Sequence, residues 1–426
     1  MAIDRRKAVL YGSAAAIRLF LFTVFPSLPD LLTGRVEIST PVTSFKRLQE
    51  GLFLYTHNVS PYDGGVFHQA PLLLPLFSLL PDLKQYPFAT NVLYTAVDLL
   101  CANALMELAQ TGQATSSRYF TSPRKRMTWS AVSIGASFLF NPFTILTCLA
   151  RPTSVFTNLF ITLATTKAAQ GATSTYIIAL SFASYLSLYP VLLFPPLAIL
   201  CYDRQASLTT KTDRSSSPIT FTITHVSALA AGIGALLYLS YFLTGFSWEF
   251  IPSTYGVQLL LPDLTPNVGL WWYFFTEMFD SFREFFLGVF WLHMASYVGG
   301  LSFRLRNQPL FVVTTLLGIF AVYQPYPSIS DTSLYFAFLA LYRHIIPLMR
   351  YSFFLVAALL YASFLGPAFY YLWVYAGSGN ANFFYAITLV WSLGLSFIVA
   401  DSLYAVLRDE WEVERPEMRG KEARQI

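Results

Sequence analysis

Two long apolar runs and a short polar break make up the stretch YSFFLVAALLYASFLGPAFYYLWVYAGSGNANFFYAITLVWSLGLSFIVADSLY, residues 351–404. Each run, 351–374 and 383–404, reaches the roughly 20 mostly apolar residues that a helix needs to cross a bilayer. The pair therefore predicts two membrane-spanning helices joined by a tight loop. The break, AGSGNAN (376–382), concentrates glycines and amides where the second helix enters the membrane.

The rest of the chain has the same apolar character. Of its 426 residues, 55% are hydrophobic and only 12% are charged, whereas soluble domains carry roughly a quarter of charged residues. This composition predicts a protein of the bilayer and disfavours a nucleic-acid partner. The start, Met1 to Arg6, leads into an apolar segment without a small-residue cleavage signal, which indicates a retained first span.

Three cysteines, Cys101, Cys148 and Cys201, each fall inside an apolar stretch. A buried free cysteine usually acts as a small hydrophobe, so the spacing predicts neither a disulfide framework nor a zinc site. No metal and no cofactor are expected. A working thiolate also needs a positive, partly exposed setting with a histidine in reach, which these positions do not offer.

We predict an all-α polytopic membrane protein with about twelve transmembrane helices. Residues 1–407 are expected to form a single membrane domain, followed by a charged cytosolic tail over 408–426. Several segments are short or interrupted by proline, which membranes tolerate against neighbouring helices or a polar cavity. The expected spans are 8–29, 87–110, 128–147, 154–170, 175–188, 190–203, 220–243, 285–303, 309–323, 332–347, 351–374 and 383–404.

Basic residues near span ends favour the cytosolic side and so predict the orientation. They cluster at the start of the chain, within 111–127, after the sixth, eighth and tenth spans (Lys211 and Arg214 among them), and in the tail. Both termini are therefore expected in the cytosol. This holds only if 175–203 crosses the membrane twice, with a bend near Tyr189-Pro190. A single crossing would reverse the predicted orientation of every later span.

The opposite, luminal side then receives the segments 30–86, 244–284, 324–331 and 375–382. In the first of these, TSFKRLQEGLFLY (43–55) places apolar residues such as Phe45 and Leu48 at helical spacing, with Lys46, Arg47 and Glu50 facing away. Such a pattern predicts an amphipathic helix along the membrane surface. Whether Asn58, in an Asn-Val-Ser sequence, carries a glycan stays open.

Four stretches together resemble the PIG-U family, the multi-span subunit of GPI transamidase. The resemblance runs from near the N-terminus to about Arg408, and it is carried by long, specific blocks. They are GRVEISTPVTSFKRLQEGLFLYTHNVSPYDGGVFHQAPLLL (34–74), NPFTIL (141–146), YPSISDTSLYFAF (326–338) and WVYAGSGNANFFYAITL (373–389).

The resemblance implies a non-catalytic subunit of an endoplasmic-reticulum complex that replaces a C-terminal signal of a proprotein by a glycosylphosphatidylinositol (GPI) anchor. Its implied partners are the caspase-like catalytic subunit, the other membrane subunits, the GPI lipid and the proprotein signal. Which helices contact which subunit, and whether the signal binds this chain directly, cannot be read from the sequence.

A rival interpretation follows from topology, because the family is similar to the polytopic (GT-C-like) lipid-linked-sugar glycosyltransferases. The alternative function is a dolichyl-phosphate-sugar-dependent mannosyltransferase of GPI assembly. Such enzymes carry an Asp-x-Asp pair in the first luminal loop, since glycosyl transfer needs a carboxylate base. Here the corresponding region reads TGRVEIST (33–40) and retains a single carboxylate, Glu37.

The candidate GPI-binding residues are Asn380, Asn382, Phe383 and Phe384, with Asp331 and His68 as further candidates. Glycines allow close backbone approach, the two amides can donate and accept hydrogen bonds, and the phenylalanines begin an apolar wall. Each candidate has a plainer alternative: the asparagines as turn residues, Asp331 as a helix cap, and His68 as a loop residue bonded to backbone.

Two charges, Arg18 and Asp98, lie within the first two predicted spans. An unpaired charge at that depth costs about 2.5–3.5 kcal/mol on insertion scales. A structural ion pair between neighbouring helices therefore accounts for both residues, and contact with a lipid headgroup is the alternative.

Overall fold

The fold is that of a computed structural model, which describes residues 5–81, 85–208 and 217–421. Within these ranges the chain forms helices and no β-strand, apart from one isolated bridge between Ser116 and Thr121. This confirms the all-α prediction. Lys211 and Arg214, which support the predicted orientation, lie outside the described residues, as do the ends of the predicted domain and tail.

Each of the twelve predicted spans falls on a helix or on consecutive helices. Six helices are long and apolar enough to cross a membrane, or up to seven if the bent pair α6–α7 counts as one span. The predicted spans fall mainly on α1 (Arg5–Val24), α5 (Pro87–Gln110), α6 (Ala131–Leu139), α7 (Pro142–Ala150), α8 (Ser154–Gln170), α9 (Thr173–Leu186), α10 (Phe194–Leu208), α11 (Pro218–Leu243), α14 (Asp280–Arg304), α15 (Pro309–Tyr323), α16 (Ile329–Leu339), α17 (Ser352–Tyr370) and α18 (Ala381–Glu414).

The predicted span 128–147 is not one straight helix. It is divided into α6 and α7, whose axes are bent by 54°. The break lies at Asn141, whose side chain accepts a hydrogen bond from the Phe143 N–H at 3.0 Å and so caps a new helix. Pro142 follows at the first helical position, where its missing N–H costs nothing.

The segment 173–208 folds back on itself as a helical hairpin. A 3₁₀ turn over Tyr189–Leu193 separates α9 from α10, and both helices pack on α8. At the open end of the hairpin, Gln205 donates to the carbonyl of Gly171 at 3.1 Å. The bend predicted near Tyr189-Pro190 is therefore present, and both ends of this segment lie on the same side of the bundle.

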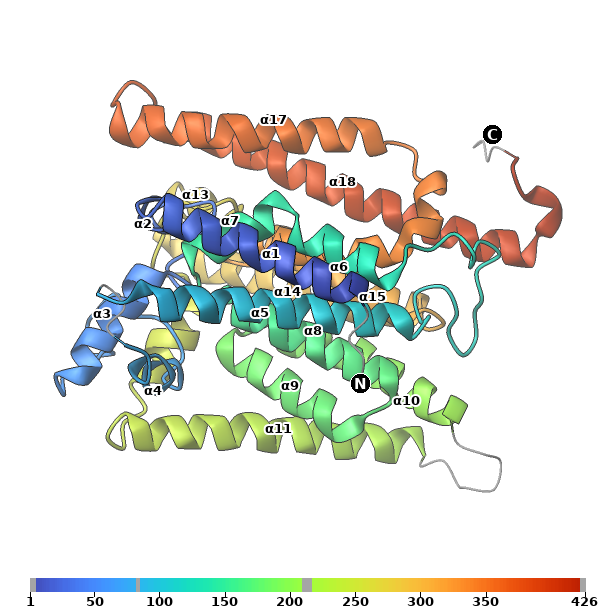
Figure 1. The fold of residues 1–426 in the computed structure, drawn as a ribbon, viewed down its shortest axis with the longest axis horizontal. Coiled ribbons are helices and arrows are strands. Elements are labelled where there is room, and N and C mark those ends of the chain that lie inside the picture. The colour runs from blue at the N-terminus through green and yellow to red at the C-terminus, as the bar shows by residue number, and fades with distance from the viewer. Residues whose placement is uncertain (1–4, 82–84, 209–216, 422–426) are drawn as a thin grey trace.

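The helices lie side by side, and the shorter elements gather at one end (Figure 1). We call this the loop end: it carries α2 (Leu28–Thr33), α3 (Phe45–Thr56), α4 (Leu73–Ser78) and α13 (Trp271–Thr276). Its segments contact one another, since the Ile329 N–H donates to the Glu37 carbonyl at 3.0 Å and the Tyr326 hydroxyl to the Asp263 carbonyl at 2.7 Å.

The predicted amphipathic stretch forms α3 with the expected sides. Phe45 and Leu48 are buried, whereas Lys46 and Glu50 are exposed. Arg47 is only partly exposed, and its guanidinium forms an ion pair with Asp263 at 2.8 Å. The contact joins the segment 30–86 to the segment 244–284, so an ion pair to another part of the chain holds α3 in addition to the burial of its apolar face.

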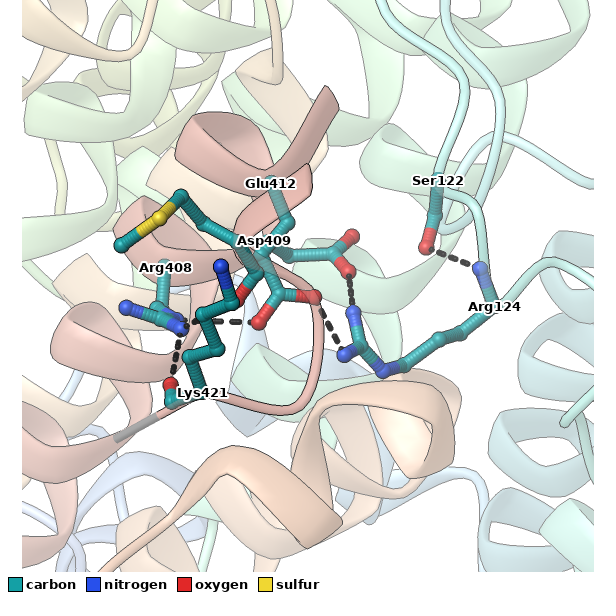
Figure 2. A network of polar contacts seen from close by, with 7 residues as sticks. Ser122, Arg124, Arg408, Asp409, Glu412 and Lys421 are labelled. Carbon is teal, nitrogen blue, oxygen red and sulfur yellow. Dashed lines mark hydrogen bonds and ion pairs between the residues drawn. The ribbon is translucent and has the colours of Figure 1, made fainter. Parts of the chain in front are cut away.

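The opposite end, where α1 begins and α18 ends (Figure 1), carries charged residues that form ion pairs. We call it the clamp end, after the contacts of Arg124 in the loop between α5 and α6. Its guanidinium contacts Asp409 at 2.7 Å and Glu412 at 2.5 Å (Figure 2). Because α18 continues to Glu414, the boundary predicted at 407/408 falls inside this helix.

Arg18 and Asp98 meet in the core, as the sequence predicted. The guanidinium Nε of Arg18 lies 2.8 Å from an Asp98 carboxylate oxygen, and a second nitrogen donates to the Leu139 carbonyl at 3.0 Å. Both residues are buried. The pair ties α1 and α5 to the end of α6.

Candidate functional site

An apolar pocket of about 310 Å³ lies between the α17–α18 hairpin and the body of the protein, near the loop end. Its walls come from α2, α7, α17 and α18, which are far apart in the sequence. α17 packs on α18, and Figure 1 shows the two helices side by side at one edge of the bundle. The pocket therefore lies where a hairpin meets the core.

One edge of this pocket is charged. Arg35 contacts the Glu37 carboxylate through two hydrogen bonds, at 2.9 and 3.2 Å, and both side chains keep some exposure. The Arg35 guanidinium also lies 5.7 Å from the centre of the Tyr370 ring. A ligand with a polar head and an apolar body would meet both kinds of surface here.

The interior of the pocket has few polar groups, and its two hydroxyls are hydrogen-bonded within their own helices. Ser363 and Thr388 donate to carbonyls of their own helices, at 2.7 Å to Leu359 and 2.8 Å to Tyr385. The indole N–H of Trp391 is buried and has no hydrogen-bond partner among the described residues. The interior of the pocket therefore offers a ligand mainly apolar contacts.

The predicted loop lies between α17 and α18, two of the helices that line the pocket. Asn380 caps α18, where its side chain accepts from the Phe383 N–H at 3.2 Å, and it is exposed. Asn382 is exposed as well, and its amide oxygen accepts a hydrogen bond from the Tyr273 hydroxyl. The turn itself needs a positive φ of 63° at Gly377, which glycine adopts without strain.

Phe383 and Phe384 point to different surroundings. Phe384 is buried and forms part of the pocket wall, whereas Phe383 is exposed and stacks on Phe369 at 5.8 Å between ring centres. Next to Phe384, the Trp272 ring lies 6.0 Å away and stacks with Trp373 at 6.2 Å. Aromatic rings thus gather around Phe384, the sequence candidate that lines the pocket.

Comparison with known proteins relates most of the chain to a single family. The family described as "GPI transamidase subunit PIG-U" matches residues 12–391. The chain belongs to the PIG-U family. It is 35% identical over 410 residues to the Homo sapiens "GPI-anchor transamidase component PIGU", covering 93% of both chains. It is 35% identical to the Saccharomyces cerevisiae "GPI transamidase component GAB1", covering 95% of this chain and 96% of that one.

Of the six sequence candidates in this PIG-U chain, Phe384 lines the apolar pocket and the other five do not, and Asp331 and His68 belong to different parts of the protein. Asp331 forms a capping box with Ser328, accepting from its N–H at 2.8 Å and its hydroxyl at 3.0 Å. The helix it caps begins at Ile329, three residues before the predicted start. Asp331 also lines a separate polar cavity of about 40 Å³.

The second of these, His68, contacts the Ser253 carbonyl through Nδ1 at 2.8 Å. Burial lowers its pKa below the ordinary value for histidine, although the bond to that carbonyl acts in the opposite direction. A neutral ring bonded to backbone links the loops around 68 and 253. This geometry agrees with the plainer alternative stated from the sequence.

Several pocket residues of the PIG-U chain were not among the sequence candidates, namely Arg35, Ser363, Gly366, Ile387 and Trp391. The apolar ones look like any other residues of a spanning helix. Arg35 had a signal in the sequence, because it lies two residues from Glu37, the carboxylate already singled out in TGRVEIST.

Proposed function

We propose that this chain is a non-catalytic subunit of GPI transamidase that binds the GPI lipid and presents it for attachment to proproteins in the endoplasmic reticulum. The observation that carries the proposal is the pocket: an apolar interior, a charged edge at Arg35 and Glu37, and a wall that includes Phe384, four residues after Asn380 in the chain. GPI combines a sugar and phosphate headgroup with lipid tails, which matches this order of surfaces.

Several features support a role without catalysis. The single carboxylate of TGRVEIST, Glu37, is engaged by Arg35, and the polar cavity beside Asp331, of about 40 Å³, has room for a few waters and not for a sugar phosphate. Cys101, Cys148 and Cys201 are buried. We assign the chemistry to the caspase-like catalytic subunit, and we disfavour the mannosyltransferase alternative.

The remaining details of the proposal concern the membrane. We propose about twelve spans in a GT-C-like arrangement, with the loop end in the lumen and both termini in the cytosol. The support is that basic residues gather at the clamp end, and that the hairpin over 173–208 turns as this topology requires. The other subunits of GPI transamidase are the proposed protein partners.

The experiment that tests lipid binding uses Asn380, because its capping role and a ligand role can be separated. Asn380→Ala removes both, whereas Asn380→Asp keeps an oxygen that can cap α18 but loses the amide donor. We expect GPI binding by the purified complex, and transfer to a reporter proprotein, to fall in both variants. The expected loss is about 0.5–1.5 kcal/mol per hydrogen bond to the headgroup.

Asn382→Ala is the companion variant, and complex recovery by co-purification is the control for folding. If Asn380→Asp binds and transfers GPI like the parent while Asn380→Ala only lowers complex recovery, the amide is a helix cap and nothing more. Unchanged binding in an intact complex that carries Asn380→Ala and Asn382→Ala together would place the lipid elsewhere.

Cysteine labelling tests the proposed orientation. In a background without the three native cysteines, Gln113→Cys samples the clamp end and Ser378→Cys samples the exposed turn at the loop end. In sealed vesicles with the lumen inside, an impermeant thiol reagent should label Gln113→Cys at once and Ser378→Cys only after permeabilisation. The reverse order would invert the topology.

A further inference from the structure

A second apolar pocket, of about 450 Å³, lies at the clamp end. It meets the first pocket at Phe143 and Ser363, and from there it is lined by α6, α16, α17 and the 3₁₀ segment Ala340–Leu348. Its far edge is formed by Trp129 and Met349. The proposed GPI site does not use this half of the groove.

The edge of the second pocket carries positive charge. The Arg343 guanidinium lies 5.5 Å from the centre of the Trp129 ring, and Arg343 is exposed. Lys125 and Arg126, three or four residues before Trp129, are exposed too. Interfacial tryptophans and arginines of this kind sit at the level of lipid headgroups.

Among the described residues, Lys125, Arg126 and Arg343 have no carboxylate partner, although carboxylates are common at the clamp end. Five other arginines there are paired with acidic side chains, namely Arg118, Arg124, Arg304, Arg306 and Arg408. The charge of Arg343, which lies against Trp129 at the pocket edge, is therefore left for a partner outside this chain.

We propose that the second pocket binds one anionic phospholipid from the leaflet at the clamp end, distinct from GPI. Its acyl chain lies against α17, and its phosphate lies within reach of Arg343. A guanidinium binds phosphate oxygens through paired hydrogen bonds, and its stacking on Trp129 holds it at the pocket edge.

The positive charge at the edge of the second pocket determines which class of phospholipid headgroup the site should prefer. A basic residue near a membrane contributes about 1 kcal/mol of attraction for anionic lipid, which corresponds to roughly fivefold in affinity. A zwitterionic lipid can fill the same apolar groove but gains little from three unpaired cations. The site should therefore select phosphatidylserine or phosphatidylinositol over phosphatidylcholine.

The test is native mass spectrometry of the intact purified complex, with phosphatidylserine and phosphatidylcholine supplied at equal concentration. The parent should retain one phosphatidylserine, and Arg343→Gln should reduce this retention by roughly fivefold or more. Lys421→Gln, which removes an exposed charge outside the pocket, is the matched control and should change nothing. Val356→Trp, at an exposed pocket position, should also prevent retention.

Two further measurements test whether the ligand is a phospholipid and not free phosphate, and whether its site is distinct from the GPI site. Inorganic phosphate should not displace the lipid, because the apolar tail provides most of the contact. GPI binding should be unchanged in Arg343→Gln, so failure of this proposal and failure of the GPI proposal give different patterns. Equal retention of both phospholipids, or retention that Arg343→Gln and Val356→Trp leave intact, would refute the proposal.

Discussion

Gly366→Phe should abolish GPI transfer to a reporter proprotein while the chain still assembles with its partners. Gly366 lies on α17 at the wall of the first pocket, and an added Cβ would meet only Ile387, at 3.5 Å. Because Gly366 lines the pocket, we expect an aromatic ring at this position to extend into it. If it excludes four methylenes of a lipid tail, at about 0.8 kcal/mol each, binding weakens by about 3 kcal/mol, or more than a hundredfold.

Gly366→Ala is the matched control for this prediction. A methyl at 3.5 Å from its neighbour is in ordinary contact, and alanine favours a helix by about 1 kcal/mol over glycine. We therefore expect Gly366→Ala to assemble and to transfer GPI like the parent. Binding of GPI to the purified complex and transfer to the reporter are measured together with co-purification. Normal transfer by an assembled Gly366→Phe complex would show that no tail enters this pocket.

The sequence predicted the helices of this fold well, because length and apolar content are local properties. It also predicted the ion pair of Arg18 and Asp98, since two isolated charges in neighbouring spans have few other ways to be satisfied. The break between α6 and α7 was missed although its signal, Asn141-Pro142, is plain in the sequence. There the capping asparagine and the proline outweighed an apolar run long enough for one helix.

The candidate site was predicted only in part, for a physical reason. The capping position of Asn380 is local, and the sequence could place it beside Phe384 at the start of a helix. The pocket is not local, because its walls come from residues 31–38 in the first loop, from α7 and from the α17–α18 hairpin. Only packing brings Arg35 to Tyr370 and Leu146 to Ile387, and an apolar residue facing a pocket has the same periodicity as one facing lipid.

Arg18→Met should remove most of the chain from the membrane, because it leaves Asp98 buried and uncompensated. Breaking a buried ion pair by removing one partner costs roughly 3–5 kcal/mol, a large part of the 5–15 kcal/mol that stabilises a typical domain. Here the loss also frees the Leu139 carbonyl, to which Arg18 donates at 3.0 Å. We expect a steady-state level of the tagged chain well below that of the parent, and no recovery of complex.

The double replacement Arg18→Met with Asp98→Leu separates a structural pair from a lipid contact. If the two charges serve only each other, removing both leaves an apolar core, and the chain level should recover much of the loss seen with Arg18→Met alone, because apolar replacements of a buried pair are often neutral. GPI binding by the recovered complex should then be normal, since neither residue lines the pocket. A double variant that is stable yet fails to bind GPI would instead favour the headgroup alternative. Because Arg18 is fully buried and its guanidinium is already shared between Asp98 and Leu139, the structure leaves it no exposed nitrogen for such a contact, and we expect recovery with normal binding.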